Sequence, residues 1–139
     1  MSDARAAFRN LVIAGCAPDI EPTRVIPAGA VDTPQRAPKG DMPFAIIKWS
    51  DTGDKAFGKI GSQYVEVWFY DPQRTFSRIA SIMERCKDVI TSAEHETGAD
   101  DFTLTQADWT GDSTDMYDDM YGAVTRRSTY RVAARYTGS

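Results

Sequence analysis

The sequence holds one histidine and two cysteines, so it has few of the side chains that most often carry catalysis or bind metals. A standard zinc site takes four well-placed Cys, His or carboxylate ligands, which one histidine and two remote cysteines do not provide. Phosphate-binding loops of the GxxxxGKS/T type and a GxGxxG turn after a strand are also missing. His95 stands among polar residues, where a solvated loop position is a simpler interpretation than a catalytic one. These absences predict a protein that is not an enzyme and that has no cofactor or bound metal.

The chain also lacks long apolar runs and an excess of basic residues. No run approaches the roughly 20 apolar residues of a membrane span, and residues 1–5 place an acid and a base where a signal peptide would be apolar. The formal net charge is −4, whereas a nucleic-acid-binding domain of this size normally shows a basic patch. The sequence therefore predicts a cytosolic protein that holds neither a membrane nor a nucleic acid tightly.

The length and the composition are those of one ordinary globular domain. The chain has 139 residues, of which 42% are hydrophobic and 26% are charged, and these values argue against disorder along the whole chain. A domain of this length buries roughly two thirds of the surface of its unfolded chain, which suffices for folding without disulfides. We find no repeat and no domain boundary, so we predict a single domain over residues 1–139. Cys16 and Cys86 are then expected to be buried thiols rather than a disulfide.

The N-terminal part of the chain combines one helix with a long irregular segment. Residues 3–14 carry apolar side chains at helical spacing, and Gly15 is the type of residue that ends a helix. The proline-rich segment 16–42 contains five prolines, each of which fixes φ and removes a backbone donor. Regular structure is expected there only as a short strand at residues 23–26. A segment of this length without its own core usually wraps a surface or meets a partner.

Two strands are expected next, with a loop between them. Residues 43–49 form a near-continuous apolar run of strand length, and the polar, glycine-containing residues 50–62 predict a mobile hairpin loop. Residues 63–70 alternate between a face of valine and phenylalanine and a face of tyrosine, glutamate and tryptophan. Because both faces are largely apolar or aromatic, one is expected to pack on helices and the other to be covered by something else.

The C-terminal half adds a helix, a loop and two strands. Residues 75–91 carry an apolar stripe at spacings of three and four, which predicts the main helix, and Cys86 lies in that stripe as a core thiol. Residues 102–109 alternate weakly as a strand, and residues 110–119 are expected to form an acidic loop. Residues 127–136 alternate between a core face and a basic face. The order of helix, strands, helix and strands predicts an α+β fold.

The aspartate-rich residues 112–119 raise the question of a calcium site. An EF-hand loop places its ligands at alternating positions around a central glycine, and neither feature is present in this stretch. A solvated, negatively charged loop is therefore the simpler prediction, and we expect no metal there.

Several segments, taken in order, carry more information than any one motif. A short helix that ends near Gly15 is followed by RVIP at residues 24–27, PFAIIKWS at residues 43–50 and VEVWFY at residues 65–70. The main helix, an acidic stretch at residues 115–121 and a closing strand headed by an arginine come after them. In this order, over nearly the whole chain, the segments resemble the tail-terminator, or tail-completion, proteins of long-tailed bacteriophages, which join the tail to the head.

The resemblance implies an α/β sandwich, with a mostly antiparallel sheet backed by two helices, that assembles into a homohexameric ring. Such a ring caps the tail tube, stops its polymerisation and offers its other face to the head–tail connector or stopper protein. DNA passes through the central hole without specific binding, which suits an acidic chain. The implied partners are other copies of the chain, the major tail tube protein and the connector. The implied location is the neck end of the virion tail, after assembly in the host cytoplasm.

Two groups of residues are candidates for contacts in such a ring. A heterologous interface joins different patches of neighbouring subunits, and the proline-rich segment, the loop 50–62 and the basic strand face could supply those patches. The interface candidates are Arg24, Asp51, Lys55, Phe57, Lys59, Arg127, Arg131 and Arg135. Candidates for an acidic lining of the hole are Asp112, Asp115, Asp118 and Asp119, for which solvated outer loops are an equally good interpretation.

Two other interpretations stay open at this point. The first is another head–tail connector or neck protein such as a stopper, but those proteins are more often all-β barrels, and the amphipathic helix 75–91 argues against them. The second is a cytosolic ligand-binding or enzymatic α+β domain. That class would need a polar pocket, and the sequence offers no convergent set of His, Cys or carboxylate residues for one.

Overall fold

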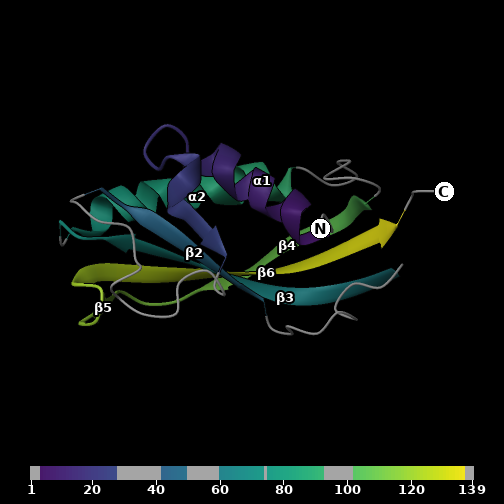
Figure 1. Ribbon diagram of the computed structural model, residues 1–139. Coiled ribbons are helices and arrows are strands. Elements are labelled where there is room, and N and C mark those ends of the chain that lie inside the picture. The colour runs from purple at the N-terminus through teal and green to yellow at the C-terminus, as the bar shows by residue number, and fades with distance from the viewer. Residues whose placement is uncertain (1–3, 28–41, 50–59, 74, 93–101, 137–139) are drawn as a thin grey trace.

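The chain forms two helices and six strands within the part that the computed structural model describes, residues 4–27, 42–49, 60–73, 75–92 and 102–136 (Figure 1). The six strands form one mixed sheet, so the fold is a small α+β domain, which confirms the predicted fold class. In chain order the elements are α1 (Ala4–Cys16), the 3₁₀ turn η1 (Pro22–Arg24), β1 (Val25–Pro27), β2 (Phe44–Trp49), β3 (Ile60–Asp71), α2 (Phe76–Thr91), β4 (Phe102–Asp112), β5 (Met116–Asp118) and β6 (Ala123–Tyr136).

The sheet has the strand order β1-β2-β3-β6-β4, and β5 pairs with β6 beside that path. All the pairings are antiparallel except that of β1 with β2, which is parallel. The longest ladder joins β3 to β6, from Ile60 opposite Arg135 to Asp71 opposite Val124. The sheet is thus mostly antiparallel, as predicted.

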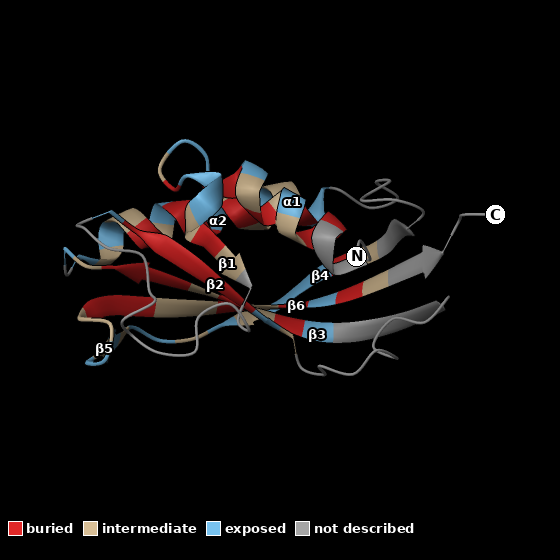
Figure 2. Ribbon diagram, in the orientation of Figure 1, coloured by how far each residue is buried: buried red, intermediate tan, exposed pale blue. Residues whose placement is uncertain are grey.

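Both helices cover the same face of the sheet, and buried residues line the space between the two layers (Figures 1 and 2). On β3, Val65, Val67 and Phe69 are fully buried on this side, and Phe8 and Val12 of α1 pack in the same cluster. The predicted alternation of β3 and the apolar stripe of the main helix are therefore confirmed. The buried residues of α2 are Ile79, Ile82, Met83, Cys86 and Ile90.

Helix α1 continues through Gly15 and ends at Cys16, so the prediction that Gly15 stops the helix is wrong. Gly15 instead lies against α2, where a Cβ atom would stand 2.7 Å from Cys86 Cα and 2.8 Å from Cys86 Sγ. Protein atoms do not approach that closely without displacement, so only glycine permits this helix–helix distance. A glycine at the end of a helical pattern has the same sequence signal whether it stops the helix or contacts a neighbour.

The C-terminal end of α1 is held by a side chain of α2. Arg85 donates from Nε to Gly15 O at 3.0 Å and from Nη2 to Cys16 O at 3.3 Å. The same Nη2 pairs with Asp19 Oδ2 at 2.7 Å. Because the last carbonyl groups of a helix have no partner within the helix, these bonds satisfy acceptors at its end and fix α1 against α2.

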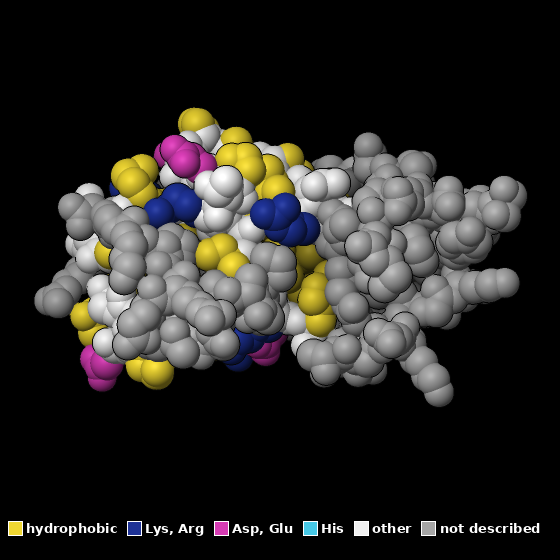
Figure 3. Space-filling model, in the orientation of Figure 1, with side chains coloured by type: hydrophobic (Ala, Val, Ile, Leu, Met, Phe, Trp, Pro, Cys, Tyr) yellow, Lys and Arg dark blue, Asp and Glu magenta, His cyan; other side chains and the backbone are white. Residues whose placement is uncertain are grey.

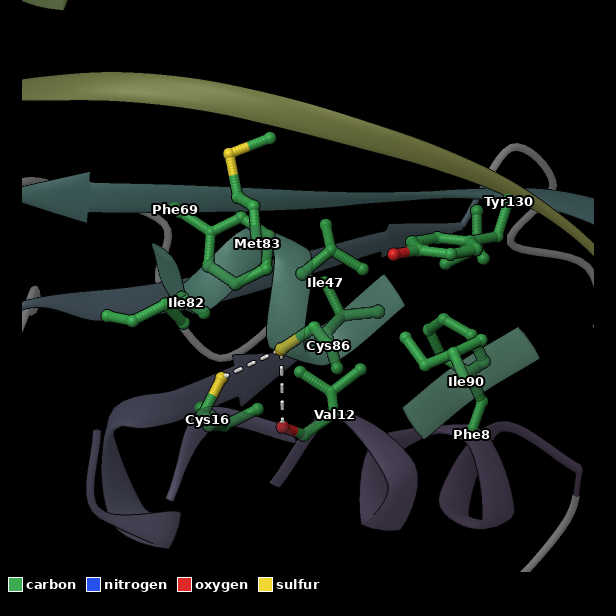
Figure 4. Close-up of a cluster of buried hydrophobic side chains, with 14 of the residues drawn as sticks. Phe8, Val12, Cys16, Ile47, Phe69, Ile82, Met83, Cys86, Ile90 and Tyr130 are labelled. Carbon is green, nitrogen blue, oxygen red and sulfur yellow. Dashed lines mark hydrogen bonds between the residues drawn. The ribbon is translucent and has the colours of Figure 1, made fainter. Parts of the chain in front are cut away.

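Cys16 and Cys86 lie side by side in the core, with their Sγ atoms 3.6 Å apart (Figure 4). Both are fully buried, as predicted, and both are free thiols. Their separation of 70 residues in the chain gives no sign of this contact. The hydrogen bond with Cys16 and the burial of the group raise the pKa of Cys86 well above its ordinary value. Cys86 therefore stays protonated and unreactive in the native fold.

Alkylation is expected to distinguish the folded chain from the unfolded one. Iodoacetamide should label both cysteines rapidly in urea and neither of them on the same timescale in native buffer, as counted by mass spectrometry. Raising the pH to about 9.5 should ionise an ordinary thiol, whose pKa is about 8.5. It should leave native Cys86 unlabelled, because the raised pKa keeps that thiol protonated. Rapid labelling of the native protein would contradict the packing of α1 on α2.

Several strands extend beyond their predicted ranges. β3 begins inside the predicted loop 50–62, because its first residues continue the ladder with β6. β4 reaches Asp112 and β5 covers Met116–Asp118, so the prediction of a loop over residues 110–119 is wrong for much of that range. β6 starts earlier than expected, at Ala123. In each case the added residues join the sheet through backbone hydrogen bonds, which the alternation of side chains does not reveal.

The proline-rich segment 16–42 contains less strand than expected in its described part. Residues Pro22–Arg24 form the 3₁₀ turn, and β1 covers Val25–Pro27, so the strand predicted at residues 23–26 begins two residues later. Proline at the first position of the turn suits a helical turn, because the N–H that it lacks would have no partner there. Residues 28–41 lie outside the described part of the chain.

Candidate interface on the sheet

The face of the sheet opposite the helices, which we call the outer face, combines aromatic and charged side chains. Side chains alternate along a strand, so the core positions Val65 and Val67 place Tyr64, Glu66 and Trp68 on the other side. Tyr64 is 52% exposed, which makes it one of the large hydrophobic residues most open to solvent. The outer face is defined by Lys48 of β2, by Tyr64, Glu66 and Trp68 of β3, and by Arg127 and Arg131 of β6.

Trp68 stands at the centre of four interacting side chains on this face. Lys48 Nζ lies 5.3 Å from the centroid of the Trp68 ring, and Arg127 Cζ lies 5.4 Å from it. Trp68 Nε1 donates to Glu66 Oε1 at 3.0 Å, and Glu66 Oε2 lies 3.7 Å from Arg127 Nη1. We call Lys48, Glu66, Trp68 and Arg127 the Trp68 cluster. Its members are cross-strand neighbours, since Lys48 pairs with Glu66 and Trp68 with Arg127 in the register.

The Trp68 cluster has features that suit a recognition surface. Each cation near the ring contributes about 0.5–1 kcal/mol at an exposed site, and the hydrogen bond to Glu66 fixes the orientation of the indole. A side chain that is already ordered loses little conformational entropy when a partner binds.

At one end of the outer face, Tyr121 of the same chain covers the aromatic residues of the sheet. Phe44 and Tyr70 stack with ring centroids 4.8 Å apart, and Tyr121 packs on them at 5.8 and 5.0 Å. These residues belong to a second buried cluster, separate from the main core. Burial, with the nearby Asp118, raises the pKa of Tyr70, so its hydroxyl stays neutral. The sequence predicted that something covers the second face, and the turn after β5 does so at this end.

Two of the predicted interface residues, Arg127 and Arg131, lie on the outer face. Arg131 is exposed and stands opposite Tyr64 of β3 and Asp108 of β4 in the register. This confirms that residues 127–136 have a basic face, as far as their side chains are described. The side chain of Arg135 lies outside the described part of the chain, as do the loop candidates Asp51, Lys55, Phe57 and Lys59.

Arg24 has a local role. Its guanidinium donates from Nε to Pro43 O at 3.0 Å and from Nη2 to Met42 O. These bonds hold the backbone just before β2 and keep η1 and β1 beside it. Arg24 therefore works within its own chain, which weakens its candidacy as an interface residue.

Asp112 also works within the chain. Its Oδ1 accepts hydrogen bonds from Trp109 Nε1 and Ser128 Oγ, both at 2.8 Å. Lys87 of α2 lies with Nζ 3.5 Å from Asp112 Oδ2 and 4.0 Å from the centroid of the Trp109 ring. Asp112 thus links β4 to β6 and to α2. These contacts within the chain explain why an aspartate stands at this position, and no role in lining a central hole is needed.

The other acidic candidates surround β5. Asp115 forms an ion pair with Arg126. Asp118 Oδ1 accepts from the backbone N–H groups two and three residues further on, at 2.9 and 3.1 Å, and so orders the turn into β6. Asp119 is exposed in that turn. No group of three or more potential metal ligands occurs among the described residues, so the acidic stretch has no described cation site.

A further feature of the described chain lies on α2. A shallow depression on the exposed side of α2 is lined by Glu84, Arg85 and Asp88, with Ala80 and Ser81. It is open to solvent and holds no cysteine or histidine, and His95 lies outside the described residues. Across the described ranges, no helix is both long and apolar enough to cross a membrane.

Sequence reasoning missed four members of the outer face as site residues: Lys48, Tyr64, Glu66 and Trp68. For Tyr64, Glu66 and Trp68 the signal was the alternation on residues 63–70, whose second face is aromatic and charged. The register between strands decides which cation meets which ring, and a single sequence does not give that register. Comparison with protein-family models and with curated proteins finds no match. Function therefore has to be inferred from the fold and from this surface.

Proposed function

We propose that this chain is a structural subunit of a bacteriophage virion, a ring-forming tail terminator that caps the tail tube. In this role it stops polymerisation of the tube and provides the surface to which the head joins. The observation that carries the proposal is the two-sided sheet. The helices cover one face, and the other presents the Trp68 cluster and the half-exposed Tyr64. Arginine and aromatic residues of this kind are enriched where protein surfaces meet.

The charge of the chain is compatible with that role. A ring through which DNA passes should not bind the phosphates, and the net charge of −4 gives no electrostatic basis for holding them. The fold also has the architecture that the resemblance implies, a mostly antiparallel sheet backed by two helices. A cyclic ring requires each subunit to offer two different patches, one for each neighbour.

Electron microscopy of particles assembled without this protein tests the proposal. Tails of abnormal or excessive length beside unjoined, filled heads are expected, because nothing would then stop the tube or connect it. Adding the purified chain back should restore joining. Tails of normal length that still fail to join heads would replace termination with a connector role. Normal virions would remove the chain from virion assembly altogether.

A further inference from the structure

Both edges of the sheet are protected against pairing with another strand. At the β1 edge, Arg9 donates from Nε and Nη2 to Val25 O at 3.1 and 2.8 Å, and Pro27 has no N–H to offer a neighbour. At the β4 edge, the ladder with β6 shifts register in two places, and such bulges interrupt a regular edge. Strand addition is therefore disfavoured at β1 and at β4, and the outer face is the better surface for a partner.

The outer face carries a positive balance on a negative chain. Its six defining residues carry the three cations Lys48, Arg127 and Arg131 against the one carboxylate of Glu66, and Asp108, opposite Arg131 on β4, reduces this balance to +1. Asp118 of β5 belongs to the covered end of the sheet, beside Ala123. The whole chain has a net charge of −4. The cations flank aromatic rings, so the face suits an acidic segment that also brings an apolar side chain.

The chain itself contains such a segment, which we call the acidic turn: Asp118, Asp119 and Met120. Met120 is 70% exposed, the largest value among the exposed large hydrophobic residues. In Figure 3, acidic and hydrophobic side chains lie next to each other at the end of the molecule where Figure 1 places β5. The turn is ordered by the bonds to Asp118 Oδ1 and by Gly122 N, which donates to Asp118 O at 2.8 Å. An ordered turn binds at a lower entropic cost than a flexible loop.

The acidic turn does not reach the exposed part of the outer face of its own chain. Ala123, just after the turn, and Arg131 are eight positions apart on the same strand, which corresponds to about 26 Å at about 3.3 Å per residue. Tyr121, next to Met120, already packs on Phe44 and Tyr70 at the near end. Trp68 lies nearer, opposite Arg127 and against the cluster on which Tyr121 packs, whereas Tyr64 and Arg131 lie at the far end of the face. A contact of the turn with Tyr64 and Arg131 therefore requires a second molecule.

We propose that the outer face of one copy of this chain binds the acidic turn of a second copy. Met120 then packs on the ring of Tyr64, and Asp119 faces the cations, with Arg131 as its main partner. Because the two patches differ, the contact is heterologous and repeats from copy to copy until a ring closes. This inference rests on the proposed ring-forming function and names the two surfaces that build the ring.

Two variants with opposite defects test the contact. The face variant carries Tyr64→Ser and Arg131→Ser, and the turn variant carries Asp119→Ser and Met120→Ser; all four residues are exposed, so the fold should be kept. Circular dichroism and thermal unfolding check the fold. In sedimentation velocity, the wild-type chain should form closed oligomers, and each variant alone should be monomeric. In an equimolar mixture, the intact turn of the face variant can bind the intact outer face of the turn variant, so the mass should double. Assembly should stop at this dimer, because its two remaining surfaces are both defective.

Other outcomes would overturn the contact. These are a wild-type chain that stays monomeric at its highest soluble concentration, a folded variant that still forms rings, and a mixture that stays monomeric. Glu84→Ser on the exposed side of α2 is the control and should assemble like the wild type. Failure of the contact is separable from failure of the proposed function. If variants that do not pair as described still restore normal tails, only the proposed contact is refuted. If the mixture forms dimers but tails are normal without this chain, only the proposed function is refuted.

Discussion

Replacing Arg78 with alanine is expected to lower the free energy of unfolding by about 3 kcal/mol, the lower end of the range for breaking a buried ion pair. Arg78 donates from Nε to Asp71 Oδ2 at 2.9 Å and from Nη2 to Asp71 Oδ1 at 2.6 Å. The Asp71 side chain is 0% exposed and the Arg78 side chain 27% exposed. Without Arg78, the carboxylate keeps only the backbone N–H of Gln73, at 3.0 Å, as a described donor. Urea denaturation followed by circular dichroism measures the loss.

The pairing geometry is tested by two further variants. Arg78→Lys keeps the charge but loses the two-pronged contact, so its loss of stability should be intermediate. Asp71→Asn in the Arg78→Ala background removes the uncompensated charge and should recover part of the stability. Glu84→Gln, on the exposed side of the same helix, is the control and should change stability by less than about 1 kcal/mol, as for exposed ion pairs. An Arg78→Ala chain as stable as this control would show that Asp71 is not paired as described.

The parts of the fold that were predictable are those in which one face of an element is buried. Residues 63–70 alternate, and apolar residues in 75–91 recur at helical spacing, because the strand and the helix each bury one side in the core. The sequence therefore shows the period of each element directly. The residues at the end of β4 and in β5 show no such alternation or repeat. These residues are strands because their backbone groups pair with β6, which is long enough to pair with both β4 and β5.

The candidate site was predictable only in part, for a related reason. Alternation placed Arg127 and Arg131 on a basic face, because one strand suffices to show it. The Trp68 cluster draws on three strands, and a shift of register by one residue would place Trp68 against the helices. Arg24 and Asp112 were candidates because exposed charge is the default expectation. Their partners are backbone carbonyls and distant side chains that only the folded chain brings near.

The two layers of the molecule divide structural and surface roles. Helix α1 is tied to α2 by the contact at Gly15 and by Arg85, and α2 is tied to β4 by Lys87. The sheet is therefore supported from one side along much of its width. A supported sheet presents the side chains of its outer face in fixed positions, which a recognition surface requires. Loss of the close contact between α1 and α2 should consequently weaken the whole domain.

Gly15→Ala is expected to cost about 2–3 kcal/mol, although alanine favours helices by up to about 1 kcal/mol over glycine. The new Cβ would stand 2.7 Å from Cys86 Cα, which is backbone and cannot rotate away. Helix α1 would have to move from α2, and the hydrogen bonds from Arg85 to Gly15 O and Cys16 O would lengthen. The midpoint of urea unfolding measures the loss, and native alkylation of Cys16 and Cys86 should accelerate in the same variant.

The neighbouring residue provides a control of opposite sign. Ala14 is exposed on the same helix, so Ala14→Gly should cost up to about 1 kcal/mol through helix propensity alone. Relative to glycine, alanine is thus expected to stabilise the protein at position 14 and to destabilise it at position 15. Because the clash involves backbone, Cys86→Ala should relieve only the part that Sγ contributes, at 2.8 Å. A Gly15→Ala chain at least as stable as the wild type would mean that the two helices do not approach as closely as described.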